Sequence, residues 1–293
     1  MRESILVTGA SGKLGREVVR QLRASGYYTR VVSRNPERGV SELLGDECLH
    51  FDWDKPESYL PVIEGATRIF LTARPLDTNA AEVVPIFLDH CNDAGVQHIV
   101  FSSALGADHN HMGPLSLVES HLMNLGVAWT ILRPNFFMEN FSQGWLAPSI
   151  KSEGLINLSA GSGRTSFISV NDVAAVVTKV FSDPTHHGKA YNLTGDDPMS
   201  HTAVAAALTK ASGRPVNYHE ISDEDLRDMG RRAGLPGGQL EYFVRLFQMV
   251  REGYSARVYP DVKELLGRGP IGFNEFAKAN ANIWKVNSSS ARA

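Results

Sequence analysis

Short apolar runs alternate with segments of helical periodicity through the first half of the chain. Six runs are predicted strands, at 5–8, 29–33, 48–51, 68–72, 98–102 and 127–132. Between two of them, Leu14, Val18, Val19 and Leu22 mark one apolar face of a helix. This rhythm is typical of right-handed βαβ crossovers. It predicts an α/β fold with a doubly wound parallel sheet.

The alternation ends after Arg133-Pro134, where an aromatic-rich stretch follows. Beyond it we predict a helix over 171–181 with Asn171 as its N-cap residue. From about Met199 the sequence is mainly helical, with helices expected at 200–211, 223–233, 237–252 and 272–284. We therefore expect a first domain of residues 1–155, to which 165–195 returns, a smaller helical substrate lobe of 196–286, and a flexible tail of 287–293.

Composition excludes several classes of protein. The net charge of -3 offers no basic face for nucleic acid. We expect neither a membrane span nor a charged-then-apolar leader at Met1. Two cysteines are too few for a disulfide framework. We expect a cytoplasmic monomer or homodimer whose partner is a small-molecule substrate, with neither nucleic acid nor membrane bound.

A glycine-rich turn follows the first predicted strand and leads directly into the first helix. Glycine allows a tight turn, lets a pyrophosphate approach bare backbone, and lets helix pack on strand. The phosphates would rest on free N–H groups at the start of the helix. An incidental glycine turn is the alternative. The predicted dinucleotide-binding residues here are Thr8, Gly9, Ser11, Gly12, Lys13, Leu14 and Gly15.

The end of the second strand indicates which dinucleotide binds. NAD-specific sites place a carboxylate there to hold the ribose 2′-hydroxyl, whereas this chain has Ser33, Arg34 and Asn35. The planar guanidinium of Arg34 suits a 2′-phosphate, with Arg38 and Lys13 as further cations nearby. A solvated arginine on a loop is the alternative. The sequence thus predicts a Rossmann fold that binds NADP(H) as its cofactor.

Other strand ends are expected to complete this site, because ligands bind at the carboxyl edge of such sheets. Asp52 could accept a hydrogen bond from the adenine amino group, and Trp53 could flank the ring or simply pack in the core. The remaining predicted residues follow the fourth and fifth strands and approach the ribose and nicotinamide: Thr72, Ala73, Arg74, Ser102 and Ser103.

Several segments together resemble the NmrA-like branch of the atypical short-chain dehydrogenase/reductases. They are 8–15 (TGASGKLG), 31–38 (VVSRNPER), 96–103 (VQHIVFSS), 130–141 (TILRPNFFMENF), 169–174 (SVNDVA) and 190–194 (AYNLT). Within that branch the chain is similar to the group of NADPH quinone reductase, triphenylmethane reductase and festuclavine dehydrogenase. The resemblance implies a Rossmann fold, NADPH and a substrate pocket between two lobes. The branch also includes NmrA, a dinucleotide-binding regulator without known turnover.

The tyrosine–lysine dyad of the tyrosine-dependent relatives is absent from this sequence. No Tyr occurs between Tyr59 and Tyr191, and no Lys between Lys55 and Lys151. Reduction of a carbonyl to an alcohol needs such a proton donor, so that chemistry is disfavoured. If a proton is needed, Glu119 and His121 on the fifth predicted helix are the candidate catalytic residues.

The leading interpretation is an NAD(P)H-dependent oxidoreductase that transfers hydride to a flat, electron-poor molecule such as an iminium, a quinone or a dye. Rings after the sixth strand could stack on such a substrate, or pack as core. The predicted substrate-binding residues are Leu105, Asn135, Phe136, Phe137 and Trp145. The alternatives are a non-catalytic NADP(H)-binding redox sensor and another cofactor-assisted reaction such as isomerisation. No metal is expected, because His109, His111 and His121 have no fixed carboxylate or cysteine beside them.

Overall fold

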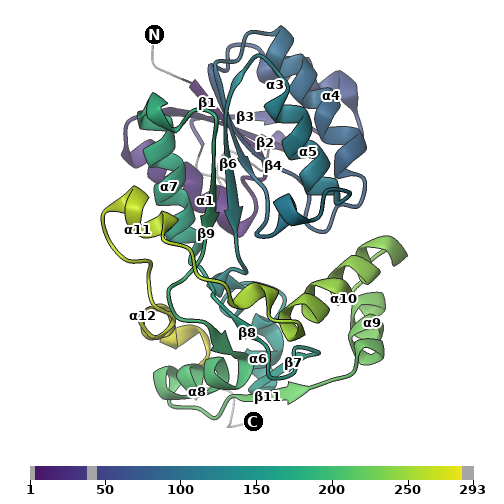
Figure 1. Ribbon diagram of the computed structural model, residues 1–293, viewed down its shortest axis with the longest axis vertical. Helices are drawn as coiled ribbons and strands as arrows, with labels where there is room; N and C mark the ends of the chain where they lie inside the picture. The colour runs from purple at the N-terminus through teal and green to yellow at the C-terminus, as the bar shows by residue number, and fades with distance from the viewer. Residues whose placement is uncertain (1–3, 38–44, 286–293) are drawn as a thin grey trace. The chain divides into compact units, whose positions relative to one another are not determined.

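The computed structural model describes residues 4–37 and 45–285 (Figure 1). The chain divides into two compact units, each built from separate stretches of sequence. Unit 1 comprises 1–134, 170–193 and 260–268. Unit 2 comprises 135–169, 194–259 and 269–293.

Unit 1 is organised around a seven-stranded sheet in the order β3-β2-β1-β4-β5-β6-β9. Every pair of neighbours in the described sheet is parallel, as the βαβ rhythm predicts. The strand order reverses between β1 and β4, the place where such sheets bind ligands. The strands are β1 Ser4–Val7, β2 Tyr28–Ser33, β3 Glu47–His50, β4 Arg68–Thr72, β5 His98–Ser102, β6 Ala128–Pro134 and β9 Lys189–Leu193.

Helices cover both faces of this sheet (Figure 1). On one face α1 packs against α7, and on the other α4 packs against α3 and α5. The helical segments of unit 1 are α1 Lys13–Ala24, η1 Pro56–Ser58, α3 Tyr59–Ile63, α4 Ala80–Asp93, η2 Ala107–His109, α5 Pro114–Met123, α7 Val170–Ser182, η4 Pro184–His186 and α11 Asp261–Leu266. The doubly wound parallel sheet predicted from the sequence is therefore confirmed.

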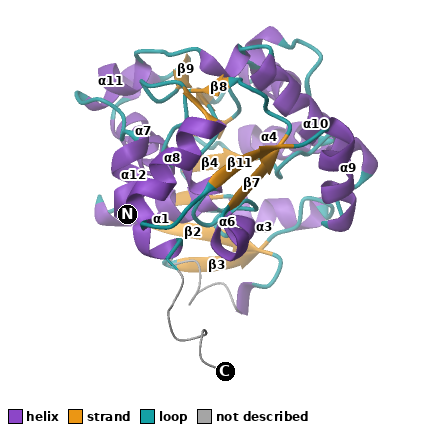
Figure 2. Cartoon of the chain, turned by 90° about the horizontal axis from the view of Figure 1, so that it is seen from below, coloured by secondary structure: helices purple, strands orange, loops and turns teal. Residues whose placement is uncertain are grey.

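Unit 2 is mainly helical around two small sheets. A parallel pair joins β7 (Leu155–Leu158) to β11 (Asn217–Glu220), as Figure 2 shows, and an antiparallel pair joins β8 (Arg164–Thr165) to β10 (Met199–Ser200). Its helical segments are η3 Met138–Asn140, α6 Ala147–Glu153, α8 His201–Ser212, α9 Asp223–Arg232, α10 Gly237–Arg251, η5 Tyr254–Ala256, α12 Phe273–Ala279 and η6 Ala281–Ile283. Their apolar faces meet in a core that includes Phe141, Leu208, Phe247 and Trp284.

The structure departs from the expected boundaries at several places, and residues 260–268, expected in the smaller lobe, belong to unit 1. Residues 135–155 lie in unit 2, because the chain that leaves β6 adds no strand to the large sheet. Helix α7 begins at Val170, so the prediction of Asn171 as N-cap is wrong. The helix expected over 272–284 breaks at Asn280, whose side-chain amide donates to the Phe276 carbonyl and competes with the backbone.

Candidate functional site

The glycine turn after β1 depends on the absence of side chains. Gly9 has a φ of +64°, a left-handed conformation that glycine adopts without strain. A Cβ on Gly15 would lie 2.2 Å from the carbonyl oxygen of Gly9, so a side chain there would displace the backbone. At Gly12, by contrast, a Cβ would meet only the Gly9 oxygen, at 3.2 Å. The turn is thus tight at both glycines, and tightest at Gly15.

Helix α1 begins at this turn without a capping hydrogen bond from an N-cap side chain. Gly12 is the N-cap residue, and it supplies no capping side chain. The first turn of α1 contains no acidic residue. Uncapped N–H groups and the positive end of the helix dipole favour an anion. These features fit the pyrophosphate of a dinucleotide.

The predicted residues around the turn take different positions. Ser11 is exposed and Lys13 is half-buried, whereas Leu14 is buried in α1. Thr8 is fully buried, and its hydroxyl accepts a hydrogen bond from the Thr72 N–H at 2.8 Å. Thr8 therefore ties the end of β1 to the end of β4.

The polar residues after β2 face outward. Arg34 and Asn35 are exposed, and the Asn35 N–H donates to the Ser33 hydroxyl oxygen at 3.1 Å. Arg38, the second cation expected here, lies outside the described residues. Within those residues no carboxylate forms an ion pair with Arg34, so its guanidinium suits a phosphate.

An ion pair joins the loop after β3 to the loop after β4. Arg74 donates to both carboxylate oxygens of Asp54 at 2.9 Å and to Asp77 at 2.9 Å. Asp52 accepts from the Asp54 N–H at 3.1 Å. Arg74 thus acts as a clamp between two loops at the carboxyl edge of the sheet.

Trp53 belongs to an aromatic cluster. Its ring centroid lies 4.8 Å from that of Phe51, 5.4 Å from that of Phe87 and 6.1 Å from that of Tyr59, all in edge-to-face geometry. The Tyr59 hydroxyl also donates to the Trp53 carbonyl at 2.7 Å. The packing interpretation of Trp53 therefore has direct structural support, and only the free part of its ring could flank an adenine.

The loop after β5 continues to pair with β6. The Ser103 N–H donates to the Leu132 carbonyl at 2.8 Å, and the Leu105 N–H donates to the Pro134 carbonyl at 3.0 Å. Ser102 is half-buried, whereas Ser103 is only 7% exposed. The Ser103 hydroxyl has no hydrogen-bond partner among residues 4–37 and 45–285. An unsatisfied buried hydroxyl is costly unless a ligand or water completes it.

Glu119, one of the two candidate proton donors, is buried in an ion-pair network. Its carboxylate accepts from Arg133 Nη2 at 2.6 Å and from Arg133 Nε at 3.1 Å. Arg133 Nη1 donates to Asp108 at 3.0 Å. Burial raises the pKa of Asp108, but the hydrogen bond from His109 and the charge of Arg133 outweigh it, so the pKa is lowered. The sequence analysis assigned no role to Arg133 and Asp108, because no spacing rule predicts the ion pair between them.

His121, the other candidate, is half-buried on α5 and contacts α4. Its Nε2 is 2.7 Å from a carboxylate oxygen of Asp89 on α4. Glu119 and His121 therefore have separate surroundings, as their two-residue spacing on a helix requires. Glu119 contacts the guanidinium of Arg133, and the His121 ring contacts the carboxylate of Asp89.

The predicted substrate residues of unit 2 divide into supporting and exposed positions. Asn135 is buried; its amide donates to the Ser255 carbonyl at 2.9 Å and its oxygen accepts from the Phe136 N–H at 2.9 Å. Phe137 is half-buried and pairs with Ile168. Trp145 is 42% exposed, an unusual position for an indole.

Structure adds residues to this region that periodicity could not assign. The ring of Phe247 on α10 lies 5.9 Å from Phe136, and that of Phe243 lies 5.0 Å from Trp145. Glu139 is 5% exposed and accepts from the Ser169 hydroxyl at 2.8 Å. The only hint in the sequence was the density of aromatic residues on both stretches.

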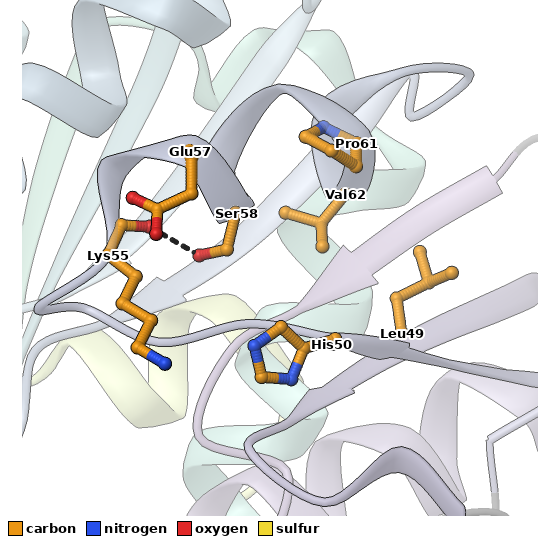
Figure 3. A pocket seen from close by; sticks show the side chains of 7 residues that line it. All are labelled: Leu49, His50, Lys55, Glu57, Ser58, Pro61 and Val62. Carbon is orange, nitrogen blue, oxygen red and sulfur yellow. Dashed lines mark hydrogen bonds between the residues drawn. The ribbon is translucent and has the colours of Figure 1, made fainter.

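A surface hollow of about 330 Å³ lies beside β3, η1 and α3 (Figure 3). The Ser58 hydroxyl in its lining already donates a hydrogen bond to the Lys55 carbonyl at 2.7 Å. The lining contains no predicted site residue: Leu49, His50, Lys55, Glu57, Ser58, Pro61 and Val62. The hollow therefore does not mark the dinucleotide site.

Two further limits apply to the described residues. No three His, Cys, Asp or Glu side chains in residues 4–37 and 45–285 are grouped so that they could hold a metal ion. Over the same residues, every helix is too short or too polar to cross a bilayer.

Comparisons with known proteins agree with this picture. The chain is 30% identical to the NAD(P)H azoreductase of Xenophilus azovorans, covering 94% of this chain and 98% of that protein. It is 30% identical to agroclavine dehydrogenase of Claviceps fusiformis, with 96% and 98% covered. Among solved structures, triphenylmethane reductase of Citrobacter sp. complexed with NADP(H) matches with a TM-score of 0.78, at 25% identity, over 95% of this chain and 99% of that one.

These matches confirm, at the level of the family, the predicted NAD(P)H-dependent oxidoreductase class and the predicted NADP(H) cofactor. A model of the NmrA-like family matches residues 1–277. Because that match spans almost the whole chain, the protein belongs to the NmrA-like family.

Proposed function

We propose that the protein is an NADPH-dependent reductase that transfers hydride to a flat, electron-poor small molecule: an iminium, a quinone or a dye-like cation. The observation that carries the proposal is that Gly12 gives the start of α1 no capping side chain, and that Arg34 after β2 is exposed. Two relatives whose names state a substrate act on azo and triphenylmethane compounds, both conjugated acceptors.

The residues of unit 1 have distinct roles in this proposal. Amides at the start of α1 hold the pyrophosphate, and Arg34 holds the 2′-phosphate with Ser33 and Asn35. The Arg74 clamp fixes the loops after β3 and β4, and the Ser103 hydroxyl offers a hydrogen bond to the ligand. When bound, the cofactor supplies a hydride from its nicotinamide ring.

The ion pairs favour an acceptor that needs no proton from the protein. Both carboxylate oxygens of Glu119 already accept hydrogen bonds from Arg133, so this side chain is engaged within the protein. Hydride addition to a cationic carbon yields a neutral product without a general acid. A quinone that has accepted the hydride would take one proton from water to form the hydroquinone. Both reactions suit a site whose candidate acids are already engaged.

The test is the loss of NADPH absorbance with three acceptor classes: quinones, cyclic iminium ions and triarylmethane dyes. Cofactor affinity is measured in parallel by NADPH fluorescence. Turnover with at least one class supports the proposal. Tight cofactor binding with no turnover in any class would refute it and support the redox-sensor alternative. A protein that binds neither NADPH nor NADH would refute both.

A further inference from the structure

The loop after β5, residues 103–110, first continues the large sheet and then leaves it; we call it the β5 loop. The Ser103 N–H donates to the Leu132 carbonyl of β6 at 2.8 Å. The Leu105 N–H donates to the Pro134 carbonyl at 3.0 Å. Later N–H groups in the β5 loop donate to carbonyls of the loop itself. The backbone hydrogen bonds that reach the sheet thus come from the first part of the loop.

The side chain of Arg133, which lies between those two carbonyls in the sequence, contacts the second part of the β5 loop. Its Nη1 donates to the Asp108 carboxylate at 3.0 Å, whereas its Nε and Nη2 donate to Glu119 on α5. All three residues belong to unit 1. The Asp108 side chain is 31% exposed and that of Arg133 is 11% exposed. Strand β6 therefore holds the β5 loop twice, through its backbone and through this ion pair.

The β5 loop begins with a buried hydroxyl group. Ser103 is 7% exposed, and its Oγ has no hydrogen-bond partner among the residues that the structure describes. A buried hydroxyl in this condition is costly unless a ligand or water completes it. Ser103 also lies at the carboxyl edge of the sheet, where ligands bind in folds of this kind. Together these observations mark the start of the β5 loop as part of a ligand site.

The order of the strands indicates which part of a dinucleotide reaches this hydroxyl. Arg34 follows β2 and the glycine turn follows β1, whereas β5 lies two places beyond β1, across the point where the strand order reverses. A dinucleotide with its 2′-phosphate at Arg34 and its pyrophosphate at the start of α1 therefore extends its nicotinamide half toward β4 and β5. The adenosine half stays on the side of β2.

Resting on the cofactor site of the proposed function, we infer that Asp108 is a positioning residue for the nicotinamide half of NADP(H). It acts through Arg133 rather than by touching the ligand, and it keeps the β5 loop ordered before the cofactor binds. A loop that is ordered in advance loses less conformational entropy on binding. Ion pairs that are partly exposed contribute little to the stability of the folded protein. The effect of Asp108 is therefore expected on cofactor binding rather than on folding.

Removing Asp108 leaves no buried charge without compensation, because Glu119 still accepts from Arg133 Nη2 at 2.6 Å. Asp108→Ala should therefore fold. Glu47→Ala is the matched control, since Glu47 pairs with Arg30 at 2.8 Å and their side chains are 39% and 10% exposed. Glu47 is the first residue of β3 and so lies at the opposite, amino edge of the sheet. The control thus removes the same kind of ion pair away from the expected ligand site.

The experiment measures the affinity of the full chain for NADP⁺ and for 2′,5′-ADP by calorimetry. The second ligand has the adenosine half with its 2′-phosphate and lacks the nicotinamide half. We expect Asp108→Ala to weaken NADP⁺ binding about 5–30-fold, the cost of ordering one loop residue, and to leave 2′,5′-ADP within about twofold. Glu47→Ala should leave both affinities unchanged.

Ser103→Ala is a second variant, which keeps the ion pair and changes the loop by one hydroxyl. It should weaken NADP⁺ binding and leave 2′,5′-ADP unchanged. Asp108→Ala should then cost less affinity when it is added to Ser103→Ala, because the two residues act on the same loop. Equal losses for the two ligands in Asp108→Ala, or no loss for NADP⁺, would overturn the inference.

These titrations contain no electron acceptor, so they are separate from the test of the proposed function. A protein that shows the expected binding pattern and reduces no acceptor would refute the proposed function and support the positioning role of Asp108. Turnover with an acceptor, together with an unchanged NADP⁺ affinity in Asp108→Ala, would do the reverse.

Discussion

Replacing Glu119 by Gln separates a structural role from a catalytic one. Gln has nearly the same shape as Glu, but it removes the negative charge beside Arg133. Glu119 is 2% exposed and the Arg133 side chain 11%, so the remaining guanidinium stays mostly out of water. Breaking a buried ion pair on one side typically costs about 3–5 kcal/mol.

The expected cost here lies at the low end of that range. Asp108 remains 3.0 Å from Arg133 Nη1 and continues to compensate its charge. We therefore expect Glu119→Gln to destabilise unit 1 by about 3 kcal/mol. For a domain of this size that corresponds to a fall of about 6–12 °C in melting temperature.

Calorimetry and acceptor-driven NADPH oxidation, measured well below the melting temperature, provide the assay. We expect kcat per folded molecule to change less than threefold. Arg133→Met and the double variant complete a double-mutant cycle, in which the second substitution should cost less once Glu119 is gone. Ser120→Ala is the exposed control on the same helix. A variant of unchanged stability whose kcat falls a hundredfold would show that Glu119 donates a proton after all.

Three further outcomes are expected. Arg34→Ala should weaken NADPH about 10–100-fold, as loss of a charge-assisted contact does, and leave NADH nearly unchanged in fluorescence titrations; equal losses would place the 2′-phosphate elsewhere. Gly12→Val should abolish binding of both dinucleotides, because its side chain would fill the space that the pyrophosphate needs, and the Gly9 oxygen 3.2 Å from the new Cβ would have to shift slightly; unaltered affinity in a folded variant would contradict the pyrophosphate site. Burial lowers the pKa of His98 to about 3 and that of His201 to about 4, so the unfolded chain takes up protons first as pH falls. Melting temperature should therefore fall as the pH drops below about 6.5, which is the ordinary pKa of histidine. His98→Gln should reduce the slope of melting temperature against pH; an identical slope would refute this origin.

Local periodicity was enough to predict the sheet of unit 1. The strands at 68–72 and 98–102 were placed correctly because apolar runs bounded by polar residues leave few alternatives. The glycine turn was equally readable, since its function depends on backbone geometry that only glycine permits.

Contacts between distant segments could not be read in the same way. The pairing of Arg133 with Glu119 joins β6 to α5, and no spacing rule links the two. Likewise, Phe243 and Phe247 fit an ordinary amphipathic helix, and only tertiary packing brings them to Trp145. The sequence pattern likewise does not show that the chain leaves the large sheet after β6, where the two units divide.

Unit 1 is built from three separate stretches of the chain, and this limits when it can finish folding during synthesis. Strand β9 and helix α7 arrive only after a stretch of unit 2 has been synthesised, and 260–268 arrives later still. Asp172 on α7 is fully buried, and Arg268 contacts it at 2.8 Å from that last segment. A ribosome-bound chain that ends before residue 260 would hold this carboxylate without its guanidinium. The first half of the protein should therefore reach its native stability only when synthesis is almost complete, and a fragment cut at residue 155 should not substitute for it.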